Sequence, residues 1–338
     1  MPDIKVTTWN IEHMNNWFQD TQSQVAPAFD GVAKKVARVI EEVKLDILCI
    51  QEGPTRKAQM ENFTKKYLSG SWTVVRGETG GSQKPYILFR NFPPLTDFEV
   101  IDFNADEWRY SFLEFDEKKN SFFHRTRPFT RLPVEVIFHT SRGAFSVICL
   151  HLKSKFAILA SGVKSTDRQK RTRAIGTALE QRARILQEGK LLRGYLQNHP
   201  FASDVHGRIL LAGDLNDGPG RDFFEERYFG TDILRQVRGD IDHPEQILTE
   251  VLNRVPPADR FTAIFFDRID NTLRPLLLDH LLVPPGFFTG TPRVVKPSAR
   301  IEHVAYKKEN EGEWSKKRKP ARKKYPSDHR PASVKIRV

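Results

Sequence analysis

The 338-residue sequence lacks long apolar runs and lacks a cysteine pattern that would form a disulfide framework. No stretch approaches the ~18 uninterrupted apolar residues of a membrane span, and no apolar signal region precedes the first alternating segment. The two cysteines, Cys49 and Cys149, each lie in an apolar run, which is typical of small buried side chains. These absences disfavour a membrane protein and a disulfide-rich secreted domain, so we expect a soluble cytoplasmic protein.

Low-complexity sequence, internal repeats and Gly/Ser-rich linkers are also missing. Glycine and proline, at 20 and 21 residues, are close to average usage, and 39% of the residues are hydrophobic. A collagen-like or mainly disordered chain is therefore excluded. Length alone would suggest about two domains. Because nothing divides the chain, we predict a single domain over residues 1–338, with insertions at 91–127 and 306–325.

Basic residues outnumber acidic ones by 54 to 42, which gives a formal net charge of +12. The excess is concentrated, because residues 307–324 carry nine basic and three acidic side chains, and residues 164–173 carry five basic side chains against Asp167. Concentrated positive charge favours a polyanionic partner, such as nucleic acid or an anionic lipid surface. The alternative is that these segments are solvated and only aid solubility.

Short apolar segments rich in Val, Ile and Phe recur along the whole chain and end at Gly, Pro, Asn or Asp, which is typical of strands. Helical patterns are confined to three segments, at about 28–44, 54–67 and 167–196. This distribution favours an α/β fold in which sheets pack face to face with helices outside. The predicted strands cover residues 4–9, 46–51, 72–75, 86–89, 98–103, 134–139, 144–150, 208–211, 261–266, 276–283 and 332–338.

Polar side chains gather at the ends of these predicted strands, where active sites are commonly built. Each has an ordinary explanation alone, because a glutamate after a strand is usually solvated, an Asp-X-Asn turn is common and a lone histidine is most often structural. Their joint occurrence is more specific. In chain order they are Trp9-Asn10, Gln51-Glu52, His151-Leu152-Lys153-Ser154, Gly213-Asp214-Leu215-Asn216, Asp279 and Ser327-Asp328-His329.

This ordered set resembles the motifs of the endonuclease/exonuclease/phosphatase superfamily, also called the DNase I-like family, from Asn10 to His329. The resemblance implies a four-layer α/β/β/α sandwich of two packed, mostly antiparallel sheets. The His-Leu-Lys-Ser form at residues 151–154 is similar to the branch that includes many bacterial members and the sphingomyelinases. The abasic-site DNA repair branch lacks this histidine motif, so we do not expect that narrower assignment.

The chemistry of phosphodiester hydrolysis explains the acidic and amide side chains in this set. A hard divalent cation held by one or two carboxylates neutralises charge on the phosphoryl oxygens. Glu52 is the natural anchoring ligand, assisted by Asn10 and Asp328. No Cys/His cluster has zinc spacing, so we expect Mg²⁺ or Mn²⁺. The resemblance agrees, because Glu52 occupies the metal-binding position of the Gln-Glu motif.

Five further motif residues are predicted to be catalytic. Asp214 and Asn216 lie two apart at a strand end, and in extended geometry both side chains point to one side. The resemblance implies that Asp214 orients or deprotonates the attacking water and that Asn216 donates to a phosphoryl oxygen. It also implies that His329, paired with Asp279, stabilises charge at phosphorus. His151 would protonate the leaving oxygen or bind a non-bridging oxygen.

Positive side chains near these motifs are predicted to bind the substrate. Lys153 follows His151 by two and is expected to face the same way. Arg131 resembles an arginine of the family's phosphate cleft, and a sheet-edge charge is the alternative. A basic run shortly before Asp328 would place positive charge near the rim of the site. The run consists of Lys316, Lys317, Arg318 and Lys319.

Two other features are interpreted as structural. His280 follows Asp279 on a predicted strand and is therefore expected to face the opposite side. An aromatic cluster in the first predicted insertion is interpreted as a local hydrophobic core, with stacking on bases as the alternative. The cluster comprises Trp108, Tyr110, Phe112, Phe122 and Phe123.

These inferences favour a metal-dependent phosphodiesterase that hydrolyses nucleic acid, as an endonuclease or exonuclease. One alternative keeps the reaction and changes the substrate to a phospholipid or inositol-phosphate head group, but no apolar hairpin for membrane docking is evident. A second alternative is a catalytically inactive nucleic-acid-binding module. The complete motif set disfavours it, since an inactive relative usually loses a metal ligand.

Overall fold

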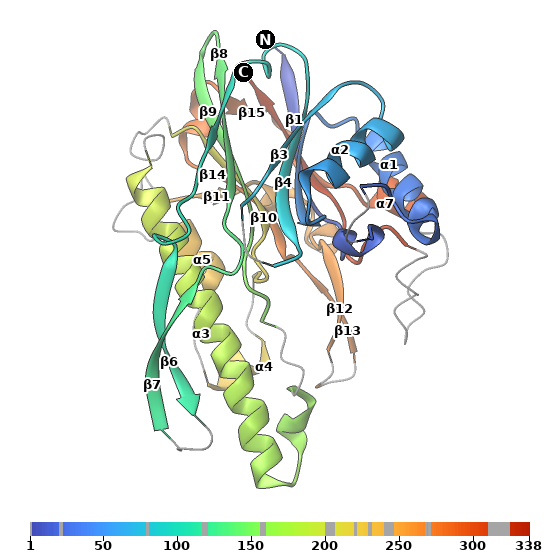
Figure 1. The fold of residues 1–338 in the computed structure, drawn as a ribbon. Coiled ribbons are helices and arrows are strands. Elements are labelled where there is room, and N and C mark those ends of the chain that lie inside the picture. The colour runs from blue at the N-terminus through green and yellow to red at the C-terminus, as the bar shows by residue number, and fades with distance from the viewer. Residues whose placement is uncertain are drawn as a thin grey trace.

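Two β-sheets pack face to face in this protein, and the longer helices lie on their outer faces (Figure 1). This arrangement is the predicted four-layer α/β/β/α sandwich. None of the described helices combines the length and the apolar character needed to cross a membrane. The computed structural model describes residues 2–19, 23–78, 81–116, 121–155, 160–199, 207–219, 222–228, 232–239, 247–267, 269, 272–309 and 325–338.

The first sheet joins strands from both ends of the chain. Its strands are β1 (Asp3–Asn10), β2 (Ile47–Gly53), β3 (Trp72–Arg76), β4 (Lys84–Arg90), β15 (Arg293–Val294), β16 (Arg300–Ile301) and β17 (Ala332–Arg337). The spatial order is β15-β17-β1-β2-β4-β3, and β16 also pairs with β17. β1 therefore lies between β17, which is antiparallel to it, and β2, which is parallel to it.

The second sheet comes from the middle of the chain. Its strands are β5 (Phe98–Ile101), β8 (Val134–Thr140), β9 (Gly143–His151), β10 (Ile209–Asp214), β11 (Thr249–Glu250) and β14 (Asp279–Val283). Their order is β11-β14-β10-β9-β8-β5; β9 and β10 are parallel, and the other described pairs are antiparallel. Separate hairpins are formed by β6 (Arg109–Asp116) with β7 (Ser121–Pro128) and by β12 (Ala263–Asp267) with β13 (Thr272–Leu276).

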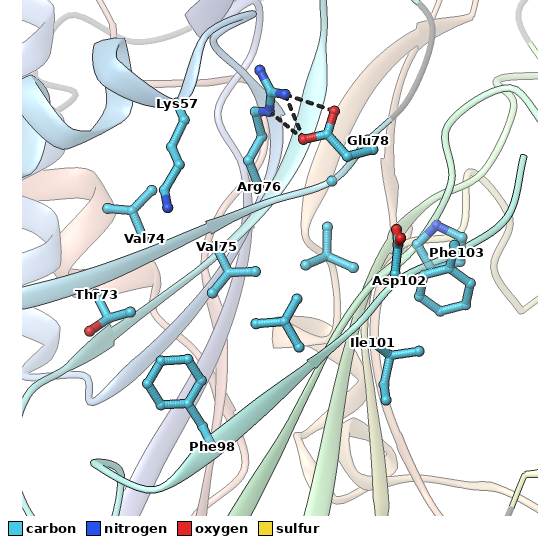
Figure 2. Close-up of a pocket in the computed structure, with 14 residues that line it drawn as sticks. Lys57, Thr73, Val74, Val75, Arg76, Glu78, Phe98, Ile101, Asp102 and Phe103 are labelled. Carbon is cyan, nitrogen blue, oxygen red and sulfur yellow. Dashed lines mark hydrogen bonds and ion pairs between the residues drawn. The ribbon is translucent and has the colours of Figure 1, made fainter.

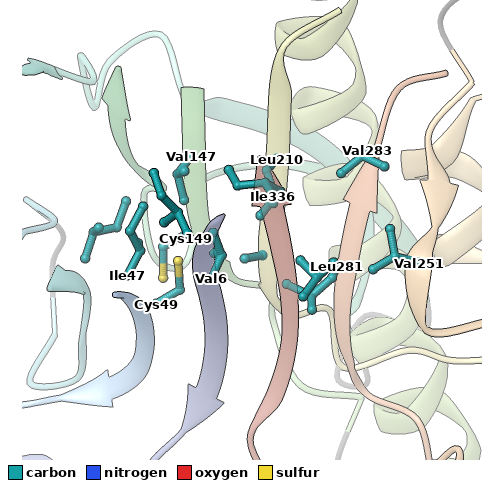
Figure 3. Packing of buried hydrophobic residues seen from close by; sticks show 14 of the residues in the cluster. Val6, Ile47, Cys49, Val147, Cys149, Leu210, Val251, Leu281, Val283 and Ile336 are labelled. Carbon is teal, nitrogen blue, oxygen red and sulfur yellow. The ribbon is translucent and has the colours of Figure 1, made fainter. Parts of the chain in front are cut away.

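Alternation along the central strands separates the core between the sheets from the cores beneath the helices. On β2, Ile47 and Cys49 face the second sheet, whereas Leu48 and Ile50 face the helices. Cys149 of β9 lies beside Cys49 in the core between the sheets, and both thiols are free and fully buried (Figure 3). The interpretation of the two cysteines as buried side chains is therefore confirmed.

Three helices cover the outer faces, and each lies within three residues of its predicted range. α1 (Asp30–Val43) and α2 (Lys57–Tyr67) pack on the first sheet, and α1 presents Val32, Val36 and Ile40 to it. α3 (Arg168–Asn198) packs on the second sheet through Ile185 and Leu192. The shorter helices are η1 (Met14–Trp17), η2 (Pro27–Phe29), η3 (Ala160–Lys164), α4 (Phe223–Arg227), α5 (Ile233–Arg238), η5 (Val251–Arg254), η6 (Pro257–Asp259), α6 (Gly286–Thr289) and α7 (His303–Glu309).

Helix α3 is longer than the strands that it covers. Its 31 residues span about 46 Å, whereas the nine residues of β9 span about 30 Å. The apolar contacts with the sheet begin at Ile185 and continue toward the C-terminus of the helix. The N-terminal half of α3 therefore extends past the sandwich, beside the β6–β7 hairpin (Figure 1).

The segment predicted as one strand over residues 276–283 is divided in two, so that prediction is wrong. β13 ends at Leu276, and β14 begins at Asp279. The break is stabilised by Thr262, whose hydroxyl accepts the backbone N–H groups of Leu278 and Asp279 at 3.0 Å each. A side chain distant in sequence therefore ends the strand, which local propensity does not predict.

The predicted insertion at residues 91–127 contains β5, which pairs with β8, and most of the β6–β7 hairpin. Trp108 packs edge-on against Phe129 in the core beneath α3, whereas Phe123 is 40% exposed. The local-core interpretation therefore holds for the buried members of the aromatic cluster, which are Trp108, Tyr110 and Phe112. The side chain of Phe122 and residues 310–324 of the second predicted insertion are outside the described part of the chain.

Candidate active site

Strand ends from both sheets meet at the end of the sandwich opposite the chain termini (Figure 1). The parallel strands β1 and β2 bring Asn10 and Glu52 to this edge. β9 and β10 are also parallel, so His151 and Asp214 lie side by side. Asp279 pairs with Asp214 at the start of antiparallel β14. The edge therefore collects polar groups from segments far apart in the sequence.

Asp214, Asp279 and His329 form a buried group that we call the His329 cluster. One possible ligand atom from each residue lies within 4.8 Å of the others. His329 Nδ1 lies 2.6 Å from Asp279 Oδ2. The indole N–H of Trp9 donates to the backbone carbonyl of His329, and the backbone N–H of His329 donates to the hydroxyl of Ser327. Both the ring and the backbone of His329 are therefore fixed in position.

Burial and neighbouring charges act in opposite directions on His329. Burial lowers its pKa, but the negative charge of Asp279 and the hydrogen bond to it outweigh burial, so the pKa lies well above the usual range. His329 is then an imidazolium at neutral pH, and both ring nitrogens are donors. Because a protonated imidazole does not ligate a metal, we interpret the His329 cluster as a charged donor and not as a metal site.

Asp214 is held by two hydrogen bonds at the centre of this edge. Its Oδ2 accepts the side-chain amide of Asn10 at 2.8 Å, and its Oδ1 accepts the backbone N–H of Asn216 at 2.8 Å. Burial raises the pKa of Asp214 to about 7, with the charge of His329 opposing the shift and the charge of Asp279 adding to it. The carboxyl group can therefore exchange a proton near neutral pH, as a general base requires.

His151 is buried beside Asp214, with its Nε2 3.6 Å from Asp214 Oδ2. Burial lowers the pKa of His151 well below the usual range, and the positive charges of Arg131 and His329 lower it further. The ring is therefore neutral at neutral pH. Of the two predicted roles, donation of a hydrogen bond to a phosphoryl oxygen fits a neutral imidazole, whereas protonation of the leaving oxygen requires the charged form.

Glu52 and Asn10 form an oxygen-rich corner next to Asp214. Glu52 lies at the end of β2 with a left-handed φ of 61°. Its Oε2 accepts the backbone N–H of His13 at 2.8 Å and the side-chain amide of Gln83. Asn10 Nδ2 lies 3.5 Å from Glu52 Oε1. Asn10 Oδ1 is buried and has no hydrogen-bond partner among the described residues.

An unpartnered amide oxygen beside a carboxylate fits a hard divalent cation, which takes oxygen ligands and keeps several waters. Asn10 and Glu52 would hold such a cation. Asp328, the third predicted ligand, has a side chain that is 25% exposed and lies 4.0 Å from His329 Nε2. The structure therefore brings two of the three predicted ligands together and places the third next to the His329 cluster.

The sequence matches the Endonuclease/Exonuclease/phosphatase family over residues 7–329. The chain belongs to this family. The resemblance inferred from the order of the motifs is thereby confirmed, and the family's chemistry is the hydrolysis of phosphate ester bonds, phosphodiesters included. No curated protein matches the chain by sequence.

Solved structures of low sequence identity share the fold of this family member. Truncated TDP2 from Caenorhabditis elegans is 15% identical with a TM-score of 0.50, over 99% of this chain and 98% of that one. Humanized TDP2 from D. rerio is 12% identical with a TM-score of 0.51, over 99% of both chains. An endonuclease/exonuclease/phosphatase from Beutenbergia cavernae is 15% identical with a TM-score of 0.51, over 99% of this chain and 72% of that one.

Of the predicted substrate-binding residues of this family member, Arg131 is connected to the corner formed by Asn10 and Glu52. Arg131 Nη2 donates to Gln83 Oε1 at 3.2 Å, and Gln83 donates in turn to Glu52. Lys153 is half-buried, and its Nζ donates to the carbonyl of Ser154 at 3.1 Å. Burial lowers the pKa of Lys153, and nearby arginines lower it further. Arg131 is thus connected to Glu52 through a single side chain.

Two predictions about side-chain direction are wrong, because neither β9 nor β10 continues to the second residue of the pair concerned. β10 ends at Asp214, and Asn216 adopts a left-handed φ of 50° with its side-chain amide donating to the carbonyl of Leu152 at 2.9 Å. The predicted extended geometry at Asn216 is therefore wrong. β9 ends two residues before Lys153, whose backbone N–H donates to Glu188 at 2.8 Å. Strand alternation therefore does not set the direction of Lys153.

The predicted basic run lies outside the described residues. It consists of Lys316, Lys317, Arg318 and Lys319. Two supporting residues, Gln83 and Glu188, were missed by sequence reasoning. Gln83 lies in a polar loop that carries no local signal. Glu188 carries one, because it shares the buried face of α3 with Ile185 and Leu192, where a charged side chain requires partners.

A cleft of about 440 Å³ lies elsewhere, between the edge strands β3 and β5 (Figure 2). Apolar side chains such as Val75 and Phe98 line it, together with the ion pair between Arg76 and Glu78. None of the predicted site residues is among those that line it. The polar groups suited to catalysis therefore lie at the strand-end edge and not in this cleft.

Proposed function

We propose that the protein is a Mg²⁺-dependent phosphodiesterase that hydrolyses nucleic acid, as an endonuclease or exonuclease. The observation that carries the proposal is the unpartnered amide oxygen of Asn10 beside Glu52, at the same edge as Asp214 and His329. Bound Mg²⁺ would supply Lewis-acid neutralisation of phosphoryl oxygens. Mn²⁺ would satisfy the same oxygen ligands.

The side chains have complementary tasks in this proposal. Asp214 orients the attacking water and accepts its proton, because its carboxyl group exchanges a proton near neutral pH. His329, kept charged by Asp279, donates from Nε2 to a phosphoryl oxygen as negative charge develops there. His151 donates from its neutral ring to another oxygen. Asn216 is a weaker candidate donor, since its amide already contacts a backbone carbonyl.

Nucleic acid is favoured over a lipid head group by the surplus of positive charge. The basic excess of +12 is larger than one head group requires. The excess is concentrated in residues 164–173 and 307–324, which favours an extended polyanion.

A substrate panel tests this proposal. The purified protein is incubated with Mg²⁺ and with single-stranded DNA, duplex DNA, RNA, sphingomyelin vesicles or inositol phosphates. We expect cleavage of nucleic acid that EDTA abolishes and Mg²⁺ restores. Hydrolysis of a lipid or inositol-phosphate head group alone would overturn the substrate assignment. DNA binding without hydrolysis of any substrate would overturn the enzymatic proposal in favour of an inactive binding module.

We also propose that the protein belongs to the branch marked by the His-Leu-Lys-Ser motif at residues 151–154, and that residues 1–338 form one domain. The first proposal is supported by the position of His151 beside Asp214. The second is supported by the pairing of β1 with β17, which joins the two ends of the chain in one sheet. Limited proteolysis that released a stable, separately folded half would contradict the single domain.

A further inference from the structure

Helix α3 begins with three exposed cations, Arg168, Lys170 and Arg171, which we call the α3 patch. None of the three has a carboxylate within ion-pair distance in the part of the chain that the structure describes. Asp167, the nearest acidic residue in sequence, instead caps the helix by accepting the backbone N–H groups of Gln169 and Lys170. The positive charge of the α3 patch is therefore not balanced by a neighbouring side chain.

Helix stability does not explain the α3 patch. Arg168 and Arg171 are three residues apart and are therefore neighbours on the helix surface, where like charges destabilise a helix. Two further basic residues, Lys164 and Arg173, lie close by in sequence and are also exposed. This concentration of one sign favours a partner that is itself strongly negative.

The α3 patch points beyond the catalytic edge. α3 connects the parallel strands β9 and β10, so it runs antiparallel to them and begins at the end of the sheet where His151 and Asp214 lie. Its first residue precedes the sheet contact at Ile185 by 17 positions, or about 25 Å. A nucleic-acid strand advances about 3.4 Å per nucleotide. The patch is therefore offset from the sheet by roughly seven nucleotides.

The projecting half of α3 is fixed to the segment that follows Asp214. Lys155 forms ion pairs with Asp217 and Glu225. Arg182 of α3 forms an ion pair with the α4 N-cap, Asp222, and stacks over the ring of Phe224. An apolar cluster adds to this attachment and joins η3, α3, α4 and the residue at the β12–β13 turn. Its members are Val163, Ile175, Ala178, Phe223, Phe224 and Ile269. The patch therefore has a defined position relative to the catalytic edge.

We propose that the α3 patch binds the phosphate backbone of a polynucleotide substrate several nucleotides away from the cleaved bond. The inference deepens the proposed nuclease function and rests on it. Lysine and arginine contacts with phosphates carry no sequence information, so the patch selects for length and not for bases. Substrates long enough to extend along α3 gain affinity by binding the α3 patch, whereas short substrates do not reach the patch.

The test compares a patch variant with a matched control. The patch variant is Arg168→Ala/Lys170→Ala/Arg171→Ala. The control, Lys34→Ala/Lys57→Ala/Lys65→Ala, removes the same charge from exposed positions of α1 and α2 on the first sheet. Binding of labelled 30-nucleotide and 4-nucleotide DNA is measured by fluorescence anisotropy in EDTA between 50 and 300 mM salt. Melting temperatures check that both variants are folded.

We expect the patch variant to bind the 30-mer about tenfold more weakly at 0.1 M salt, with a log–log salt slope smaller by about two units. Its affinity for the 4-mer is expected to be unchanged, and the control is expected to match the wild type for both oligonucleotides. Equal losses in the patch variant and the control, equal losses for both lengths, or no loss at all would overturn the inference. A selective loss of binding to anionic vesicles, with DNA binding intact, would also overturn it.

Binding in EDTA does not depend on turnover, so the failure of this inference is distinguishable from the failure of the proposed function. Hydrolysis of DNA with the same length dependence in the wild type and the patch variant would overturn the role of the patch and leave the nuclease assignment standing. Length-dependent binding through the patch, without hydrolysis, would support the patch as a phosphate-backbone surface and overturn the nuclease assignment.

Discussion

Two buried histidine–carboxylate pairs lie on opposite sides of strand β14. On one side, His329 Nδ1 lies 2.6 Å from Asp279 Oδ2, and on the other, His280 Nδ1 lies 2.6 Å from Glu250 Oε2. Asp279 and His280 are consecutive on the strand and therefore face opposite ways, as the sequence suggested. In both pairs the hydrogen bond to the carboxylate and its charge together outweigh burial and raise the pKa of the histidine.

The His280 pair has a partner for each ring nitrogen. His280 Nε2 lies 2.7 Å from the backbone carbonyl of Asp217. Glu250 Oε1 accepts the backbone N–H of Leu252 at 2.9 Å, so both carboxylate oxygens are bonded as well. This network joins β14, β11 and the loop after β10. Because each of these polar atoms already has a partner, the network has no free group for a ligand, and we interpret it as structural.

The His329 pair is surrounded by polar atoms without partners. Within the described residues, Asp279 Oδ1, Asn10 Oδ1 and His151 Nδ1 are buried and make no hydrogen bond. An unsatisfied buried polar atom costs about 1–3 kcal/mol, so a fold keeps several together only where a ligand completes them. Incomplete hydrogen bonding, and not burial or pKa, therefore distinguishes the chemical pair from the structural one.

The same substitution at the two histidines is expected to have very different effects on catalysis. His329→Gln is expected to lower kcat on single-stranded DNA by ~10²–10⁴-fold, because the charged donor is lost. His280→Gln is expected to change kcat by less than about fivefold, since structural substitutions do not remove transition-state contacts. Equal loss of activity in two variants of equal stability would contradict the division into structural and chemical pairs.

The stability of the same two variants provides the reverse test. His280→Gln is expected to lower the free energy of unfolding by about 1–3 kcal/mol, because it leaves polar groups of a closed network without partners. His329→Gln is expected to lower it less, because its surroundings are already incompletely bonded. Urea unfolding at pH 6, followed by circular dichroism, measures both values. A larger loss in His329→Gln would contradict this expectation.

Divalent cations are expected to stabilise the folded protein by binding at Asn10 and Glu52, beside the His329 pair. Mg²⁺ at ten times its dissociation constant should raise the free energy of unfolding of the wild type by about 1.4 kcal/mol. Glu52→Gln removes the anchoring charge and should abolish this gain, whereas His280→Gln should retain it. Thermal melting with and without Mg²⁺, in the absence of substrate, measures the effect. An equal gain in Glu52→Gln would contradict the assignment of Glu52 as a ligand.

The pH dependence of the closed pair is the smallest expected effect. Since the pKa of His280 is raised in the folded state, its contribution is fully present below about pH 6.5 and is lost as the pH rises through the folded-state pKa. The difference in unfolding free energy between the wild type and His280→Gln should therefore shrink between pH 6 and pH 9. A difference that grew with pH would show that the pair is stabilised in its neutral form.

The layers of the fold, and the fact that the motifs lie together at one edge, could be predicted from the sequence. Short apolar segments located most strands of the two sheets, and helical periodicity located the three long helices, because both patterns are local properties of the sequence. The order of the motifs located Asn10 and Glu52, which the parallel pairing of β1 and β2 brings within 3.5 Å. Local periodicity and the family resemblance therefore predicted the fold, and the order of the motifs predicted which residues meet at the strand-end edge.

The contacts that support the site were beyond sequence reasoning. Gln83 reaches Glu52 from a loop 31 positions away, and Thr262 ends a strand through Asp279 from 17 positions away. Asn216 has a left-handed backbone conformation, which non-glycine residues adopt rarely. These features depend on tertiary neighbours, and no periodicity encodes them.

The two thiols between the sheets make the protein its own reporter of core opening. Cys49 belongs to the first sheet and Cys149 to the second, and both are fully buried. Burial also raises the pKa of the Cys49 thiol, which suppresses the reactive thiolate. A thiol reagent reaches both sulfur atoms only when the sheets separate, so the modification rate without denaturant measures that event. Local movement at the catalytic edge leaves both thiols protected, so the modification rate reports the separation of the sheets and not the motion of loops.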